Sequence, residues 1–403
     1  MHTVVDLFSG GGGMSFGFHA HPAFRVIAAV DAQRGKPSTS SGLECNQTYR
    51  ANMGFEPHDA DLSKLTGKEL HARVGSPTVL ISCAPCTGFS RTLASNHQSD
   101  DRRNSLVDRS AQFVAALRPQ IFLMENAREL IRGNFSHHYE ALATSLRGLG
   151  YTVHGEVHRL DRYGLPQIRE RALVIATRSE LRTLGDLWSG LTLNVEATHV
   201  RRAIADLPVI EAGRVDSADP AHASPGFSDP MTKKRLAMIP RDGGSWADLR
   251  NVRGGLRAMT PAMRRYLAAG DLGSHPDVYG RLSWDRPAVT IKRECAHVGN
   301  GRYSHPEQDR LCTVRELALL QGFPRDYRFV AGSLSNMYRH VGDAVPPLIS
   351  YQLAGLCAWM LGGARPSREE MVLPGTSLRA TDLTPSAASS RRRPSRPTSS
   401  VRA

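Results

Sequence analysis

The strongest constraint on the fold is an alternation of short apolar runs with amphipathic stretches over residues 1–178. Apolar runs of four to eight residues that are rich in Val, Ile and Leu are typical of strands buried on both faces of a parallel sheet. We therefore predict an α/β fold with a doubly wound, mostly parallel sheet. The predicted strands are 3–8, 26–31, 79–82, 121–124, 153–157 and 172–177.

After residue 178 this pattern dissolves into Gly, Pro and charged residues with short apolar pieces. Over residues 179 to about 285 such a composition predicts a second, irregular domain. Two helices are predicted in this half of the chain, at 313–321 and 348–361.

The charge of the chain points to a polyanionic partner. The formal net charge is +13 and the pI is near 9.8, values that favour nucleic acid among partner classes. Residues 364–403 hold eight Arg against three acids, and their Ser, Pro and Thr content predicts a disordered basic tail. Residues 231–265 carry nine Lys or Arg against two acids. That surplus could be a solvated face or a nucleic-acid contact, and charge alone leaves both open.

Six cysteines in 403 residues do not resemble a disulfide framework. The longest apolar stretch, 348–361, is too short to span a bilayer. A strand-like run begins at Thr3, so no signal peptide is expected before the fold. We therefore expect a cytoplasmic protein that makes no membrane contact.

A Gly-rich turn, DLFSGGGGMSFGF at residues 6–18, follows the first predicted strand and lets the backbone approach a ligand closely. No Gly-Lys-Ser/Thr follows, which excludes a P-loop, and the glycine spacing fits a dinucleotide fingerprint badly. Asp31 ends the second predicted strand, where a carboxylate can bind ribose hydroxyls. Asp61 is placed to accept from an exocyclic amine, and Phe8 offers an aromatic face. These features suit an adenosine ligand without a pyrophosphate.

Cys86 lies in ISCAPCTGFS, just after the predicted strand 79–82. The carboxyl end of a strand is where open α/β sheets place their chemistry. Cys86 could equally be a small apolar filler, part of an ordinary loop, or half of a C-x-x-C pair with Cys83. No second C-x-x-C and no His-x-His partner accompanies that pair, so no metal site is predicted.

Together these motifs resemble those of the cytosine-5 DNA methyltransferase family, in that family's order over most of the chain. Pro85-Cys86 resembles the family's nucleophile motif, and Glu125-Asn126 resembles its Glu-Asn-Val. The other matching segments are the Phe8-x-Gly10-x-Gly12 turn, Gln-x-Arg-x-Arg at 167–171, and the stretches 286–290, 315–324 and 342–347.

The resemblance implies a catalytic, cofactor-binding domain over residues 1–178 and a smaller target-recognition domain over 179–334, with residues 335–363 returning to complete the first. It also implies methyl transfer from S-adenosylmethionine to carbon 5 of a cytosine flipped out of duplex DNA. Cys86 would add to carbon 6 as a thiolate, and Arg169 and Arg171 would supply the positive environment that ionises it. Glu125 would hydrogen-bond or protonate ring nitrogen 3. The implied cofactor residues are Asp6, Phe8, Gly10, Gly12, Asp31, Asp61, Pro85, Asp343 and Val345. The implied DNA contacts are Gln167 and Thr87. If the basic surplus at 231–265 contacts DNA, we expect Lys233, Lys234 and Arg235 to bind phosphates.

Several positions depart from the family pattern. Ala84 and Thr87 stand where Pro and Gln are usual, and Thr87 affects contacts of the loop with DNA but not the attack itself. Asp343 stands where Asn is usual, which predicts a reorganised edge of the cofactor site. Ala127 is a small change after Glu125-Asn126, and residues 32–46 resemble an insertion.

Three other function classes remain beside DNA methylation. A tRNA methyltransferase is disfavoured because the Cys-Phe-Thr signature of the RNA-directed branch is absent. An inactive DNA-binding relative is disfavoured by the intact motifs, and a nicotinamide oxidoreductase by the glycine spacing. We expect a nucleoid-associated monomer that reads its target sequence with residues 178–282. A cognate restriction enzyme, a phage-defence system and a solitary role all remain open.

Overall fold

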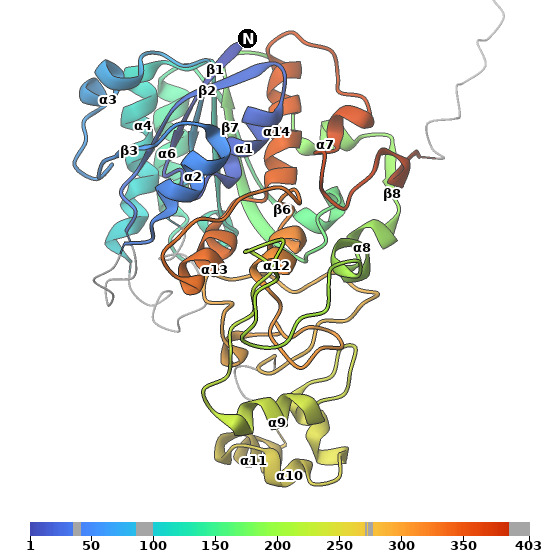
Figure 1. Cartoon of the computed structure of the whole chain (residues 1–403). Coiled ribbons are helices and arrows are strands. Elements are labelled where there is room, and N and C mark those ends of the chain that lie inside the picture. Colours follow the sequence, from blue (N-terminus) through green and yellow to red (C-terminus); the bar gives the residue numbers. More distant parts are fainter. Residues whose placement is uncertain (35–41, 86–99, 271, 273–276, 387–403) are drawn as a thin grey trace, which may run out of the picture.

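The computed structural model describes residues 1–34, 42–85, 100–270, 272 and 277–386 (Figure 1). A seven-stranded sheet in the order β3-β2-β1-β4-β5-β7-β6 forms the larger domain. Its strands pair in parallel except for β7, which is antiparallel to both β5 and β6. The predicted α/β fold with a mostly parallel sheet is confirmed. The strands are β1 (His2–Leu7), β2 (Phe24–Asp31), β3 (His58–Asp59), β4 (Val79–Ser82), β5 (Ile121–Ala127), β6 (Thr152–Arg159) and β7 (Glu170–Thr177).

Helices cover both faces of this sheet, because successive residues of each strand point to opposite sides. Val4 of β1 packs in the core on one face and its neighbour Val5 packs in the core on the other. The first face is covered by α1 (Gly13–Ala20), α2 (Cys45–Met53) and α14 (Pro347–Met360). The second is covered by α3 (Gly67–Val74), α4 (Ser105–Leu117), the short α5 (Glu129–Arg132) and α6 (His137–Gly148).

Helix α14 packs against α1, the first helix of the chain. It matches the predicted helix 348–361 within one residue at each end. It is buried along almost its whole length. A Cβ atom on Gly17 of α1 would collide with the backbone of Ser350 and Tyr351. The two helices therefore pack backbone against backbone, which only glycine permits at this position.

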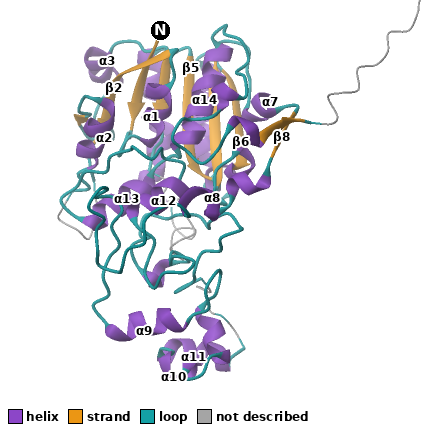
Figure 2. Cartoon of the chain, turned by 45° about the vertical axis from the view of Figure 1, so that its right-hand side comes forward, coloured by secondary structure: helices purple, strands orange, loops and turns teal. Residues whose placement is uncertain are grey.

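The smaller domain lies beneath the sheet in Figure 1 and is mostly irregular chain. Helices α8 (Val200–Ile204), α12 (Val314–Leu320) and α13 (Leu334–Asp343) form its layer nearest the sheet. A distal lobe contains α9 (Pro230–Met238), α10 (Gly255–Ala258) and α11 (Pro261–Ala268), with its own small core around Trp246 and Met263. Figures 1 and 2 both place this lobe at the end of the molecule farthest from the sheet.

The domain boundary lies later than the predicted residue 179. Helix α7 (Leu184–Trp188) and Ala197 pack in the core of the large domain, and β8 (Leu191–Leu193) adjoins it. The core of the small domain begins at Val200. Helix α13, which was predicted to belong to the returning segment, buries Tyr338 in that same small-domain core.

The prediction of a disordered tail from residue 364 is wrong for residues 364–386. Strand β9 (Leu383–Pro385) pairs antiparallel with β8, and Met371, Leu373 and Leu378 are buried in the large-domain core. These apolar residues are widely spaced among Ser, Pro and Thr. The overall composition of residues 364–403 therefore predicts disorder although part of the segment is packed. Residues 387–403 lie outside the described part of the chain.

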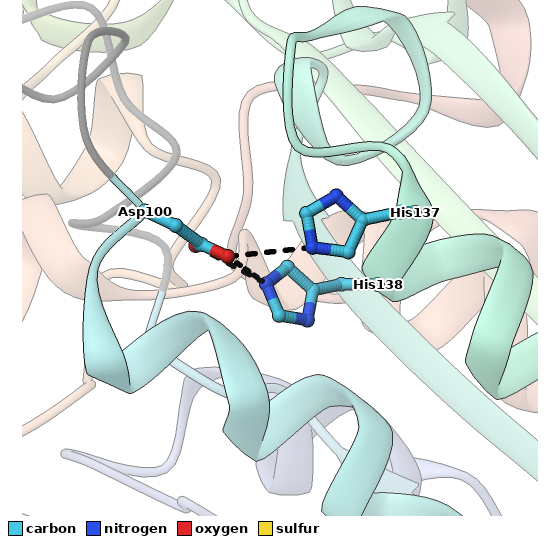
Figure 3. A group of neighbouring side chains, drawn as sticks. All are labelled: Asp100, His137 and His138. Atoms are coloured by element: carbon cyan, nitrogen blue, oxygen red, sulfur yellow. Dashed lines mark hydrogen bonds and ion pairs between the residues drawn. The ribbon is translucent and has the colours of Figure 1, made fainter.

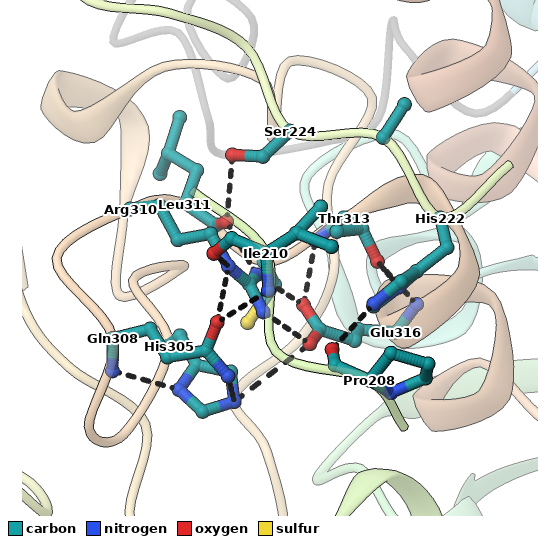
Figure 4. A network of polar contacts seen from close by, with 12 residues as sticks. Pro208, Ile210, His222, Ser224, His305, Gln308, Arg310, Leu311, Thr313 and Glu316 are labelled. Carbon is teal, nitrogen blue, oxygen red and sulfur yellow. Dashed lines mark hydrogen bonds and ion pairs between the residues drawn. The ribbon is translucent and has the colours of Figure 1, made fainter. Parts of the chain in front are cut away.

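A buried ion pair holds the small domain together (Figure 4). Arg310 donates to both carboxylate oxygens of Glu316 at 2.7 and 2.8 Å, and both side chains are 1% exposed. The same guanidinium donates to the carbonyl oxygens of Ile210 and Leu311, and the Thr313 amide donates to Glu316 at 2.7 Å. Burial raises the pKa of Glu316, but Arg310 outweighs it and leaves that pKa below its usual value. This network ties the chain around residue 210 to α12.

Candidate active site

A cleft of about 1360 Å³ opens at the carboxyl ends of the central strands, the place where open α/β sheets bind ligands. The glycine turn lies on one side of it, and the end of α13 contributes another wall. The predicted site residues that line it are Phe8, Asp31, Asp61, Pro85, Glu125, Asp343 and Val345. Residues from six separate segments thus meet in one cavity.

The glycine turn owes its shape to left-handed backbone. Gly10 and Gly12 have φ angles of 53° and 96°, which glycine adopts without strain. The Gly10 amide donates to the Asp31 carboxylate at 2.8 Å. A Cβ atom on Gly13 would collide with the carbonyl oxygen of Val345. Gly10 and Gly12 therefore shape the turn, and the turn packs directly against the chain that follows α13.

Two acids of the cleft are held by local hydrogen bonds. Asp31 also accepts from the Gln33 amide at 2.6 Å, and burial raises its pKa. Asp61 accepts from Ser63 and pairs with Arg34 at 2.6 Å. Burial raises the pKa of Asp61, but these hydrogen bonds and Arg34 outweigh it, and the pKa lies below its usual value. Each carboxylate has fixed orientation on the wall of the cleft.

Asp6 has a different place from the predicted one. It is fully buried behind the turn and accepts from the Ser15 hydroxyl at 2.6 Å, and it is not among the residues that line the cleft. Burial raises the pKa of Asp6 to about 7. Because its side chain points into the protein, we correct its predicted role from ligand contact to support of the turn.

Asp343 forms an ion pair at the cleft wall, with its Oδ2 at 3.3 Å from Nε of Arg293. The Asp343 carboxylate lines the cleft, and desolvation by the surrounding protein raises its pKa to about 6 against the opposing charge of Arg293. Nη2 of Arg293 is buried and has no hydrogen-bond partner among the described residues. A carboxylate and a guanidinium with an unused donor therefore stand side by side in the cleft.

Glu125 and Arg171 form the second charged pair of the site. They lie on the antiparallel strands β5 and β7, with Arg171 Nε at 2.8 Å from Glu125 Oε1 and side-chain exposures of 14% and 9%. The Asn126 amide donates to the carbonyl oxygen of Ala84 at 3.0 Å. Asn126 thus fixes the backbone immediately before Pro85, at the end of β4. Cys86 and Thr87, the next residues, lie outside the described part of the chain.

Arg169 and Gln167 lie at the junction of the two domains. Arg169 is 2% exposed and donates to the carbonyl oxygens of Ile291 at 3.0 Å and Ala344 at 3.3 Å. Gln167 is fully buried, donates to Gln321 and accepts from the Ile291 amide at 2.9 Å. We correct Gln167 from a predicted DNA contact to a residue that joins the domains. Arg169 has positioning contacts of the same kind.

The three predicted phosphate contacts on α9 differ in exposure. Lys233 and Lys234 are exposed. Arg235 is 6% exposed and donates to the Ala258 carbonyl at 2.6 Å and the Tyr279 hydroxyl at 2.9 Å. The prediction of a phosphate contact is therefore wrong for Arg235, whose guanidinium binds the interior of the distal lobe.

Sequence reasoning did not single out Arg293 and gave Asn126 no role of its own. Arg293 follows the matched segment 286–290 by three residues, and no spacing rule connects it to Asp343 far along the chain. Asn126 stood inside a matched motif, so its position was visible but its contact with Ala84 was not.

Among the described residues, no helix is long and apolar enough to cross a membrane.

Known proteins are similar to this chain over most of its length. Residues 2–358 match the model of the C-5 cytosine-specific DNA methylases. Type II methylase M.HgiDII of Herpetosiphon aurantiacus is 31% identical, over 87% of this chain and 94% of the relative. Type II methyltransferase M1.HphI of Haemophilus parahaemolyticus is 30% identical, over 87% and 85%.

Solved structures share the fold at lower identity. The Dnmt2 methyltransferase of S. pombe superposes with a TM-score of 0.56 at 17% identity, over 90% of this chain and 100% of that one. The methyltransferase EhMeth of Entamoeba histolytica gives 0.59 at 14% identity, over 90% and 99%. The match of the family model over nearly the whole chain shows that this protein belongs to the C-5 cytosine-specific DNA methylases.

Proposed function

We propose that this enzyme methylates carbon 5 of a flipped-out cytosine in a specific duplex sequence through a covalent bond from Cys86 to carbon 6. One observation carries the proposal. The cleft that holds the adenosine-type residues is also lined by Glu125, which pairs with Arg171, and by Pro85, the residue directly before Cys86. A methyl donor and a base bound in this cavity would meet beside Pro85, the residue that precedes Cys86 in the sequence.

The residues of the cleft fit S-adenosylmethionine. Phe8 offers a face to the adenine ring, Asp31 oxygens to the ribose hydroxyls, and Asp61 an acceptor to the exocyclic amine. The methionine end carries a carboxylate and an ammonium group, which match the unused donor of Arg293 and the carboxylate of Asp343. When bound, this cofactor supplies an electrophilic methyl group.

The chain's own groups would activate the base. The Cys86 thiolate forms a bond to carbon 6, which moves electron density onto carbon 5. Glu125 binds or protonates ring nitrogen 3 as this charge develops, and Arg171 holds the Glu125 carboxylate in place. After transfer, carbon 5 loses its proton and the Cys86–carbon 6 bond breaks, which restores the aromatic ring.

The exposed lysines of α9 are proposed to hold the DNA backbone while the base is extruded. Lys233 and Lys234 lie on the distal lobe together with exposed Arg250, Arg253 and Arg257. The Type II names of the bacterial relatives support a role in restriction–modification, with a cognate restriction enzyme that cuts the unmethylated sequence.

The test is Cys86→Ser in the full chain, assayed with tritiated cofactor and duplex DNA. Methyl transfer should fall to background while cofactor affinity stays within about threefold, because the thiol acts only on the base. Duplex with 5-fluorocytosine at the target should form a covalent adduct with the wild-type protein, since fluorine cannot leave as a cation. Transfer by Cys86→Ser at the wild-type rate would refute the covalent step.

A further inference from the structure

A cluster of two histidines and a carboxylate lies at the rim of the cleft (Figure 3). His137 and His138 begin α6, and Asp100 precedes the short helix Arg102–Asn104 that leads into α4. Asp100 and His138 also line the cleft. Neither the motifs nor the mechanism proposed for the cleft uses any of these three side chains.

The three ligand atoms converge on one point. Nε2 of His138 lies 2.9 Å from Asp100 Oδ2, and Nε2 of His137 lies 3.3 Å from the same oxygen. All three ligand atoms lie within 4.8 Å of one another. With zinc–ligand bonds of about 2.0–2.2 Å, neighbouring ligand atoms of a tetrahedral site are about 3.3–3.5 Å apart. Small side-chain adjustments would therefore suffice to admit an ion.

A second carboxylate sets the orientation of His138. Nδ1 of His138 lies 2.9 Å from Asp108 Oδ2 on α4. A histidine that donates Nδ1–H to a carboxylate presents the lone pair of Nε2 on its other side, the arrangement found behind most metal-bound histidines. In His138 that other side faces Asp100 and His137 (Figure 3).

Charge and access also suit a divalent cation. The carboxylates of Asp100 and Asp108 flank the two imidazoles. Their negative charge offsets the positive end of the α6 helix dipole, which lies at the N-terminus of the helix. His138 is 8% exposed, whereas Asp100 is 40% and His137 61% exposed. The buried histidine gives the site a fixed side and the exposed ligands leave an open one for entry and for water as a fourth ligand.

We propose that Asp100, His137 and His138 form a zinc-class metal site, with Asp108 as the residue that orients His138. The two imidazole ligands favour a transition-metal ion such as Zn²⁺ over Mg²⁺ or Ca²⁺, which prefer oxygen ligands alone. The site links the start of α4 to the start of α6 at the edge of the active-site cleft. It does not depend on the covalent mechanism, because it is tested by binding.

The experiment is a zinc titration of the full chain against a competing chromophoric chelator. One Zn²⁺ per chain should bind. Asp108→Asn should weaken this binding about 10–100-fold, the usual effect of losing a carboxylate behind a ligating histidine. His137→Ala should weaken it at least as much, and this exposed side chain can be removed without disturbing the core. His71→Ala, at an exposed histidine on α3, is the matched control and should change nothing.

Two further measurements separate the alternatives. Zn²⁺ should raise the melting temperature of the wild type and of His71→Ala, but not of His137→Ala. Co²⁺ in place of Zn²⁺ should show ligand-field bands without a thiolate charge-transfer band. A thiolate band would mean that Cys83 and Cys86 hold the ion, and it would overturn the proposal. Affinity unchanged in both variants, or no binding by the wild type, would leave the cluster as an ion pair only.

Discussion

Asp6 in the large domain and Glu316 in the small domain are both buried carboxylates, and their pKa values are shifted in opposite directions. Asp6 in the large domain is fully buried and has a pKa of about 7. Glu316 in the small domain is equally buried and has a pKa below its usual value. Asp6 accepts one hydroxyl hydrogen bond from Ser15, whereas Glu316 faces the bidentate guanidinium of Arg310. For these two acids, the group that each carboxylate binds, and not the extent of its burial, decides whether the pKa lies above or below its usual value.

The difference separates two uses of charge in this protein. In the small domain, buried arginines such as Arg281 and Arg310 are bonded to carbonyl oxygens and acids of their own domain. At the cleft, the charge of Arg293 only partly offsets the desolvation of Asp343, and the pKa of Asp343 is therefore raised. A raised pKa marks a candidate for ligand contact only where the group also lines the cleft, as Asp343 does and Asp6 does not.

The largest effect is expected at Glu316. Glu316→Gln keeps the shape of the side chain but leaves the Arg310 charge buried without its counter-charge. The loss in unfolding free energy should be about 3–5 kcal/mol, measured by urea denaturation. Asp285→Asn is the control, because the Arg201–Asp285 pair is also bidentate but lies on the surface. Equal urea midpoints for the two variants would break the comparison.

Replacing Asp6 with its amide should stabilise the protein, whereas the same change at Glu316 destabilises it, and the gain at Asp6 should depend on pH. A folded-state pKa above the unfolded value contributes stability that is complete below about pH 4 and is lost as the pH rises through about 7. Asp6→Asn keeps an acceptor for Ser15 and removes the buried charge. It should therefore be more stable than the wild type at pH 8 by roughly 1.4 kcal/mol for each unit of raised pKa.

The measurement is thermal melting of both proteins between pH 4.5 and 8. The melting curves should approach one another at the acidic end, where wild-type Asp6 is neutral. A stability difference that does not change with pH would show that Asp6 has an ordinary pKa in the folded protein.

Arg235 sharpens the comparison within α9. Arg235→Ala removes hydrogen bonds to Ala258 and Tyr279 inside the distal lobe, so we expect a loss of about 1–3 kcal/mol in stability. The dependence of DNA affinity on salt should stay as in the wild type, because the buried guanidinium releases no counterion. A reduced salt slope would mean that Arg235 turns outward onto DNA.

The smallest effect on stability is expected for the double variant Lys233→Ala with Lys234→Ala. Its melting temperature should equal that of the wild type, since both side chains are exposed. The slope of log affinity against log salt should shrink by up to about 2, near 0.9 for each lost phosphate contact. The methylated sequence should remain the same, and bisulfite sequencing would reveal a change if these lysines read bases.

Much of the large domain was predictable from local pattern. Six strands were placed within a few residues, and five of them, all except β6 (Thr152–Arg159), contain a short, mainly apolar run. Strand β3 has two exposed residues, His58 and Asp59, and carries no such pattern. The Phe8 and Asp31 positions in the cleft followed from the order of turn and strand ends. What failed required tertiary contacts: the depth of Asp6, the inward direction of Arg235, and the burial of Leu378.

The packing of α1 against α14 has a consequence for how the chain acquires its fold. The first helix of the large domain needs residues beyond 346 to cover it, and the pairing of β8 with β9 needs residues up to 385. The small domain, residues 200 to about 343, is an insertion between these parts. During synthesis the whole small domain leaves the ribosome before the large domain has received α14 and the segment that follows it. We therefore expect the inserted domain to reach its native state first.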